Sequence, residues 1–210
     1  MFLQCHKIIL NYLYNLLQLS NIIYIIIMTN EKIHEMIRVN QAGEMGAKII
    51  YEGQKKALKL KGDTKTLKLI EHMQKQEIEH FDYFDKLLKD KNIRPTIMQP
   101  IWQVGGFIMG FATAMIDKKA AMTCTTAVEE VIDDHYQEQL DYLDNIETHD
   151  KNNNKDLKEL KDKITQFRQE ELEHRDIGYD NGADKLIFFK PLSALIKHTT
   201  KLAILFSKKI

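Results

Sequence analysis

The sequence predicts an all-α protein, and three observations support this class. Gly and Pro, which interrupt helices, number only 9 and 3 in 210 residues. Long stretches repeat apolar residues at the three- and four-residue spacing of an amphipathic helix, and short polar turns separate these stretches. We expect one domain, a four-helix bundle with an apolar insertion before its third helix and an extra amphipathic helix at the C-terminus.

The expected elements follow in order along the chain. The first helix runs from about residue 30, after Thr29 or Asn30 as N-cap, to the stop signal Gly62-Asp63. The second covers about residues 64–89, and its apolar positions recur at helical spacing.

The apolar insertion, residues 101–116, follows a Pro-containing linker. It is expected either as a buried core helix or as a helix that dips into a membrane face or lines an apolar substrate channel. The third bundle helix continues to about residue 147, and a polar loop, residues 150–154, separates it from a fourth helix over about residues 156–179. The tail, residues 192–209, is amphipathic and basic, which suits either the bundle surface or an anionic bilayer.

The N-terminal 28 residues differ in character from the rest of the chain, so we expect an apolar extension (1–28) followed by the bundle domain (29–210). Polar residues interrupt the apolar run 16–27 and no small-residue cleavage site stands out, which argues against a signal peptide. The native start is expected at Met28. A membrane anchor is the alternative, although the run is shorter than the ~20 residues that a span needs.

Charge and cysteine content exclude some functions. Lys and Arg together number 30, as do Asp and Glu, so no overall field attracts DNA or RNA, and no nucleic-acid partner is expected. Cys5 and Cys124 have no metal-binding or redox spacing, which fits a reducing compartment.

A Glu-x-x-His unit occurs twice, from Glu77 to His80 and from Glu171 to His174. Residues three apart lie side by side on one helix face and can hold one metal ion between them. A single copy is a weak signal, because charged helices produce it by chance. Two copies at matching places in an internal repeat need a common cause.

The repeat extends to the first and third helices. Glu44 is followed after seven residues by Tyr51, and Glu129 after seven residues by Tyr136. The order is therefore Glu, Glu-x-x-His, Glu, Glu-x-x-His, which is typical of ferritin-like bundles that hold two iron or two manganese ions. Four carboxylates balance two divalent charges, and burying them without metal would be costly. The predicted metal ligands are Glu44, Glu77, His80, Glu129, Glu171 and His174.

Several neighbouring residues have less certain roles. Glu79, Glu130 and Glu173 are expected to be solvated, although Glu129 and Glu130 exchange roles if their helix is rotated. His135 is expected at the surface or behind a ligand. Tyr136 is the candidate catalytic residue; with Tyr51 it either hydrogen-bonds a ligand carboxylate, lies near the oxidant, or packs in the core.

The sequence resembles the demethoxyubiquinone hydroxylases, di-iron monooxygenases of ubiquinone biosynthesis, over about residues 30–208. The resemblance rests on three segments, which are Arg38–Glu44, Val128–Glu130 with His135 and Tyr136, and Glu171–Gly178. It implies O2-dependent hydroxylation of a polyprenylated demethoxybenzoquinone, with the six residues above as ligands of two Fe ions rather than Mn, and NADH as ultimate reductant.

The resemblance also implies where the protein works and with what partners. We expect peripheral attachment to the cytoplasmic side of a bacterial inner membrane, with a ubiquinone-biosynthesis complex or a homo-oligomer as possible assemblies. Two other functions use the same sequence features: a ferroxidase or iron-storage protein, which shares the metal set, and a non-enzymatic membrane-associated scaffold, which needs no metal.

Overall fold

The computed structural model describes residues 2–147 and 154–209. Over these ranges the chain forms six α-helices and one short 3₁₀ helix and no β-strand, which confirms the predicted all-α class. The helices are α1 (Phe2–Lys61), α2 (Thr64–Asp90), α3 (Gln99–Ile116), α4 (Lys118–Glu147), α5 (Asn154–Asp180) and α6 (Phe189–Lys209), with the 3₁₀ helix η1 at Ala183–Lys185.

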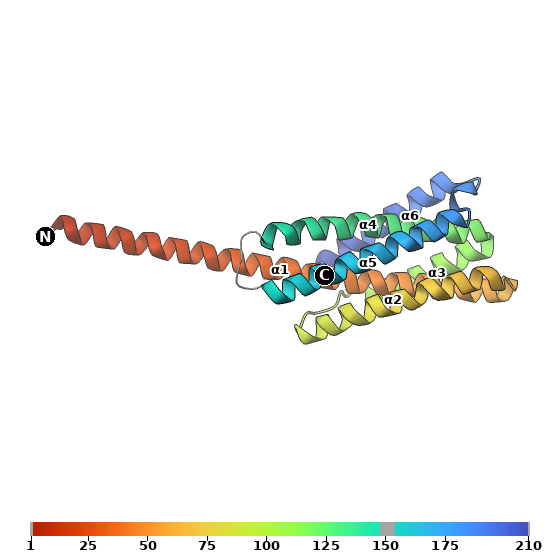
Figure 1. Cartoon of the computed structure of the whole chain (residues 1–210), viewed down its shortest axis with the longest axis horizontal. Helices are drawn as coiled ribbons and strands as arrows, with labels where there is room; N and C mark the ends of the chain where they lie inside the picture. Colours follow the sequence, from red (N-terminus) through yellow and green to blue (C-terminus); the bar gives the residue numbers. More distant parts are fainter. Residues whose placement is uncertain (1, 148–153, 210) are drawn as a thin grey trace.

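Four helices form the central bundle (Figure 1). α1 and α2 lie side by side as one pair, and α4 and α5 form the other pair. Of the two remaining helices, α3 packs mainly against α1, and α6 packs mainly against α4. Each half of the chain therefore contributes a helical pair and a third helix that covers it.

Local signals in the sequence set several helix ends. α1 ends at Lys61, and Gly62 then adopts a left-handed φ of 69°. The Asp63 carboxylate accepts a hydrogen bond of 3.0 Å from the backbone N of Thr66, which caps α2. α5 likewise ends shortly before Gly182, whose φ is 87°. The stop at Gly62 and Asp63 confirms the predicted one.

The apolar insertion forms a helix of its own, α3, which crosses α1 at unusually short range. Asp117 adopts an extended conformation and separates α3 from α4. A Cβ placed on Gly110 would lie 2.0 Å from the carbonyl oxygen of Ile50 in α1, and one on Gly53 would lie 2.3 Å from the carbonyl oxygen of Phe107. Only glycine permits this backbone approach.

α1 begins far upstream of its expected start near residue 30, so that part of the prediction is wrong. Thr29 and Asn30 are favourable cap residues, but inside a helix each costs only a few tenths of a kcal/mol relative to Ala, and no Gly or Pro interrupts the run. Figure 1 shows the first part of α1 projecting beyond the bundle. The predicted loop 150–154 lies outside the described residues, except for Asn154, which begins α5.

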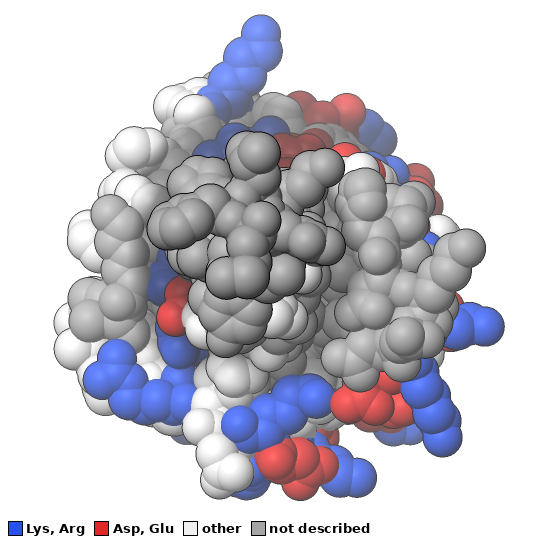
Figure 2. Space-filling model, turned by 90° about the vertical axis from the view of Figure 1, so that its left-hand side faces the viewer, with Lys and Arg blue, Asp and Glu red and all other residues white. Residues whose placement is uncertain are grey.

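The surface carries charges of both signs. Figure 2 views the end from which α1 projects, and both basic and acidic side chains appear around its rim. α3 and α6 meet where the Trp102 indole Nε1 donates a hydrogen bond of 3.1 Å to Ser207 Oγ. Among the described residues, no helix has the length and apolar character needed to cross a membrane.

The core consists of two apolar clusters that follow each other along the bundle. In α2, Ile70 and Met73 belong to one cluster, and Phe84 and Leu88 belong to the other. The Glu-x-x-His unit of α2 falls between them, and in α5 the second unit follows Phe167 in the same way. Apolar packing therefore closes both ends of the layer that contains the predicted ligands.

Candidate metal centre

The structure brings the six predicted ligands together in the middle of the bundle. α1 and α4 each supply one glutamate, and α2 and α5 each supply a glutamate and a histidine one helical turn apart. All six side chains are buried, with at most 3% of each residue exposed. They are Glu44, Glu77, His80, Glu129, Glu171 and His174.

These residues form two overlapping groups, each able to hold a metal ion. One group consists of Glu44, Glu77, His80 and Glu171. Each residue offers one ligand atom, and these four atoms all lie within 4.8 Å of one another. The second group adds Glu129 and His174 to the same two carboxylates, under the same limit. Glu77 and Glu171 are common to both groups, so they would be shared if each group held an ion.

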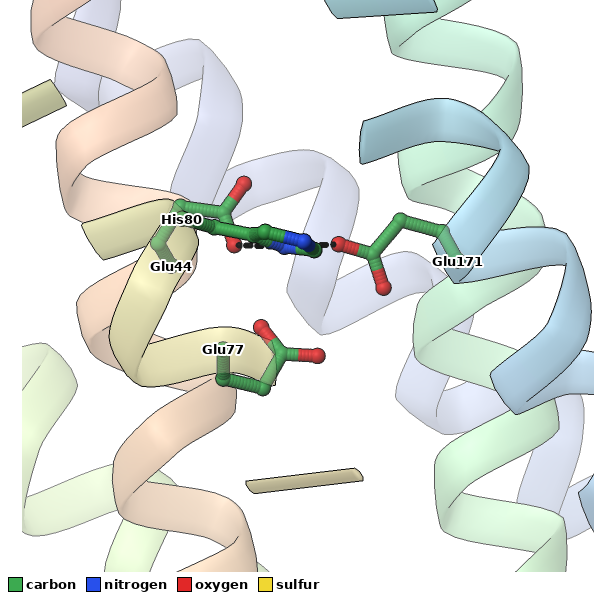
Figure 3. Close-up of side chains that lie close together, drawn as sticks. All are labelled: Glu44, Glu77, His80 and Glu171. Atoms are coloured by element: carbon green, nitrogen blue, oxygen red, sulfur yellow. Dashed lines mark hydrogen bonds and ion pairs between the residues drawn. The ribbon is translucent and has the colours of Figure 1, made fainter. Parts of the chain in front are cut away.

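Both histidines point the same ring nitrogen into the cluster. His80 Nδ1 lies 3.0 Å from Glu171 Oε1 and 3.5 Å from Glu44 Oε2. Figure 3 shows the His80 ring between these two carboxylates, with the Glu77 carboxylate beside them. His174 Nδ1 lies 3.0 Å from Glu171 Oε2 and 3.1 Å from Glu77 Oε1.

The two tyrosines of the repeat hold carboxylates of the opposite half. The Tyr51 hydroxyl of α1 donates a hydrogen bond of 2.8 Å to Glu129 of α4. The Tyr136 hydroxyl of α4 donates to Glu44 of α1. Two of the alternatives for these tyrosines therefore hold together, because both side chains hydrogen-bond a predicted ligand and both are buried members of the apolar core.

The polar atoms of the cluster fit a pair of divalent cations. Both Glu77 oxygens and Glu129 Oε2 are buried without a hydrogen-bond partner among the described residues. Glu77 Oε1 approaches His174 Nδ1, but not in hydrogen-bonding geometry. Since a buried unpartnered carboxylate is costly, cations placed among these oxygens would remove a large penalty.

Electrostatics within the cluster support the same conclusion. Burial, followed by the charge of Glu171 and the other carboxylates, raises the pKa of Glu77 and of Glu129 well above the usual range. Burial alone would raise the pKa of Glu171 as well, but hydrogen bonds from the two imidazoles lower it to about 2. Burial alone would lower the pKa of His80, but Glu171 and Glu44 raise it to about 12. The buried carboxylates therefore require positive charge nearby. Without a metal ion, the protonated imidazoles of His80 and His174 supply it.

Two residues that the sequence reasoning missed bind the outer nitrogens of the histidines. Glu170 Oε2 lies 2.5 Å from His80 Nε2, and Gln76 Oε1 lies 2.9 Å from His174 Nε2. Each of them directly precedes the glutamate of one Glu-x-x-His unit. That shared place in the repeat is the signal that could have found them.

The neighbouring acids and His135 lie outside both groups. Glu79 and Glu173 are exposed, as expected. Glu130 points away from the cluster, so Glu129 is the member of that pair that joins it. The expectation that Glu130 is simply solvated is wrong, because it is half-buried, accepts a hydrogen bond of 2.5 Å from Tyr179 and pairs with Lys197 of α6.

His135 is not a surface residue. It is buried, and its Nε2 lies 2.7 Å from Gln139 Nε2, which makes the imidazole the acceptor of an amide N–H. Gln139 in turn exchanges two hydrogen bonds with Asn40 of α1, at 2.7 and 2.9 Å. His135 therefore belongs to a buried polar link between α1 and α4 and is a member of neither candidate group.

Fold and site together define the class of this protein, an α-helical bundle whose buried carboxylates and imidazoles can hold metal. Residues 31–207 match the family described as "Ubiquinone biosynthesis protein COQ7". The chain belongs to this family.

Curated relatives support the assignment. The 3-demethoxyubiquinol 3-hydroxylase of Rhodospirillum rubrum is 46% identical over 178 residues, which cover 85% of this chain and 78% of the relative. The NADPH-dependent 3-demethoxyubiquinone 3-hydroxylase, mitochondrial, of Dictyostelium discoideum is 45% identical over 85% of this chain and 77% of its own length. The Homo sapiens protein of the same name is 38% identical over 85% of this chain and 78% of its own length.

Proposed function

We propose that this protein is the hydroxylase of ubiquinone biosynthesis that uses O2 to hydroxylate the ring of a polyprenylated demethoxybenzoquinone. Membership of the family and the names of the relatives support the reaction. The observation that carries the chemistry is the pair of overlapping buried groups that share Glu77 and Glu171. In the overall reaction, the ring C–H, O2 and a reduced nicotinamide with one proton give ring C–OH, water and the oxidised nicotinamide.

Two Fe ions are the proposed cofactor, held by the six cluster residues. Mixed carboxylate and imidazole ligands suit iron as well as manganese, but O2-dependent hydroxylation requires a metal that readily changes its redox state. When bound, the irons supply the reduction of O2 by which one oxygen atom enters the ring and the other leaves as water.

The side chains of this protein have three tasks in that reaction. Glu77 and Glu171 belong to both groups and would each contribute a carboxylate to both metal positions. Tyr51 and Tyr136 fix the carboxylates of Glu129 and Glu44 across the bundle. The apolar clusters on both sides of the layer exclude water, which would otherwise quench a strong oxidant.

We also propose that α3 and α6 dock the protein on a membrane surface, where a substrate with an isoprenoid tail resides. α3 turns Gly106 and Gly110 toward α1 and exposes apolar side chains elsewhere, including Ile108, which is 60% exposed. α6 exposes Leu205 and Phe206 together with lysines. A hydrogen bond from Trp102 to Ser207 joins the two helices. Attachment to the cytoplasmic side of a bacterial inner membrane and assembly with other ubiquinone-biosynthesis proteins or as a homo-oligomer belong to the same proposal.

An oxygen-labelling assay tests the reaction. Purified protein is loaded with Fe²⁺ without air and given a demethoxyubiquinone with a short isoprenoid tail, NADH or NADPH, and ¹⁸O2. We expect about two irons per chain and one ¹⁸O atom in the quinone product, detected by mass spectrometry. Both nicotinamides are included because NADH is our expectation while two of the relatives are named NADPH-dependent.

Variants assign the reaction to the cluster. Glu129→Ala removes a cluster carboxylate and should lower product formation at least about 100-fold. Glu138→Ala, on an exposed position of the same helix, should leave it unchanged. Equal conversion by wild type and Glu129→Ala would refute the mechanism. Iron oxidation without a hydroxylated product would favour a ferroxidase, and absence of bound metal would favour a scaffold.

Vesicle sedimentation tests the membrane proposal. Ile108→Glu on α3 and Leu205→Glu on α6 place a charge on the proposed docking face, whereas Ile78→Glu alters a residue of α2 that is also exposed, at 41%. Losing one buried large aliphatic side chain costs about 1.5–3 kcal/mol, so binding to vesicles that contain phosphatidylglycerol should fall about 10- to 100-fold for the first two variants. Binding of all three variants at the wild-type level would refute the docking face.

A further inference from the structure

The outer nitrogens of the two cluster histidines have oxygen partners that cross from one half of the bundle to the other. His80 of α2 meets Glu170 of α5, and His174 of α5 meets Gln76 of α2. The two pairs occupy equivalent places in the repeat. They differ in one respect, because the partner of His80 is a carboxylate and the partner of His174 is an amide.

An oxygen acceptor at Nε2 determines which nitrogen can bind metal. Neither a carboxylate nor an amide oxygen can donate, so Nε2 must carry the hydrogen in both pairs. Nδ1 of His80 then faces Glu44 and Glu171, and Nδ1 of His174 faces Glu77 and Glu171. A bound metal ion would take the place of the proton on that nitrogen.

The surroundings hold each imidazole ring and each partner in place. The ring of Phe167 packs on His80 with centroids 4.1 Å apart, and Tyr51 meets His174 edge-on at 6.2 Å. Glu170 uses its second oxygen to accept a hydrogen bond of 2.9 Å from Gln166, one turn earlier on α5. Its side chain is 23% exposed, so an isosteric change there should not prevent folding.

We propose that Glu170 and Gln76 are positioning residues that fix His80 and His174 for metal binding, and that the carboxylate–amide difference makes the two metal positions unequal. The inference rests on the proposed metal centre. A hydrogen bond to a carboxylate is roughly twice as strong as one to a neutral oxygen. It also makes the other ring nitrogen of the imidazole a stronger electron-pair donor to a metal ion. The position beside His80 therefore binds its ion more tightly and has the lower reduction potential.

The experiment is a titration of the metal-free full-length protein with Fe²⁺ under anaerobic conditions, in competition with a chelator, followed by Mössbauer spectroscopy of the ⁵⁷Fe-loaded protein. The wild type should bind two ions in two separate steps. Glu170→Gln should weaken the tighter step about 10- to 100-fold, which brings the two steps together. Gln76→Glu should strengthen the weaker step by a similar factor, and Glu170→Gln should also make the two iron sites more alike in the spectrum.

Controls separate this inference from the proposed centre itself. Glu173→Gln makes the same chemical change at an exposed position of α5 and should alter neither step. Circular dichroism of the metal-free variants checks that each one is folded. If Glu170→Gln and Glu173→Gln bind metal alike, or the wild-type steps are equal, the positioning role is refuted while the centre stands. If the wild type binds no metal, the centre is refuted as well.

Discussion

The close crossing of α1 and α3 makes Gly110→Ala an informative substitution. The added Cβ would lie 2.0 Å from the carbonyl oxygen of Ile50 and 2.8 Å from its carbonyl carbon. Both are backbone atoms, so no rotation of a side chain can relieve the overlap, and the helices must separate. Gly105 lies in the same helix, and a Cβ placed there meets nothing within 4 Å.

The two glycines should therefore respond in opposite directions. Replacing an unconstrained helical glycine with alanine stabilises a protein by about 1 kcal/mol, which is the expectation for Gly105→Ala. At Gly110 the same gain is opposed by an overpacking cost of about 3 kcal/mol, the upper end of the usual range, because the clash is with backbone. The net loss is about 2 kcal/mol. For a chain of this size that lowers Tm by about 4–8 °C, while Gly105→Ala raises it by about 2–4 °C.

Thermal unfolding of the metal-free protein, followed by circular dichroism, measures both shifts. A functional readout accompanies them, because Ile50 precedes Tyr51, whose hydroxyl holds Glu129. Gly110→Ala should therefore also weaken Fe²⁺ uptake, and Gly105→Ala should not. If Gly110→Ala unfolds at or above the temperature of Gly105→Ala, the close helix crossing is wrong.

Three further predictions follow from the buried polar groups. Burial, with smaller effects of Lys208 and Lys32, lowers the pKa of His135 to about 4. The unfolded chain binds this proton near pH 6.5, so the contribution of the neutral imidazole to the free energy of unfolding is present above pH 6.5 and is lost as the pH falls toward 4. Urea unfolding should show the wild type losing about 2 kcal/mol more between pH 7 and pH 5 than His135→Gln, and equal losses would contradict the assignment. Tyr136→Phe removes the donor to Glu44 and should cost the metal-free protein about 1.5–3 kcal/mol, whereas Tyr142→Phe, a half-buried tyrosine, should cost less than about 0.5 kcal/mol in the same assay. Fe²⁺ at 100 times its Kd should raise Tm by about 5–10 °C under anaerobic conditions, reversibly with chelator, and an unchanged Tm would argue against a metal centre.

The sequence predicted which residues lie together in the candidate site, for a physical reason. Helical geometry alone places Glu77 beside His80 and Glu171 beside His174, and it places each tyrosine two turns from the glutamate that precedes it. Burial of these positions follows from the apolar stripe on which they lie. Residues within one helix could thus be related without knowing how the helices pack.

Contacts between helices could not be predicted from the sequence, because they depend on how one helix is rotated and shifted against another. The partners of Glu170 and Gln76 lie on the opposite half of the bundle, and no spacing within one helix reveals them. The same holds for Glu130, which meets Lys197 of α6, and for the burial of His135 beside Gln139. The start of α1 was missed for a different reason, since a good cap residue permits a helix to begin but does not require it.

The arrangement of the cluster has a consequence for how the protein assembles. The first candidate group takes three residues from the first half of the chain but needs Glu171 from the second, and the second group takes three from the second half but needs Glu77 from the first. The tyrosine contacts cross between the halves in the same way. Neither half can complete a group alone, so a bound metal ion and the docking of the two halves would stabilise each other. Glu77 and Glu171 therefore belong to both candidate groups at once, whereas Glu44 and Glu129 each belong to only one.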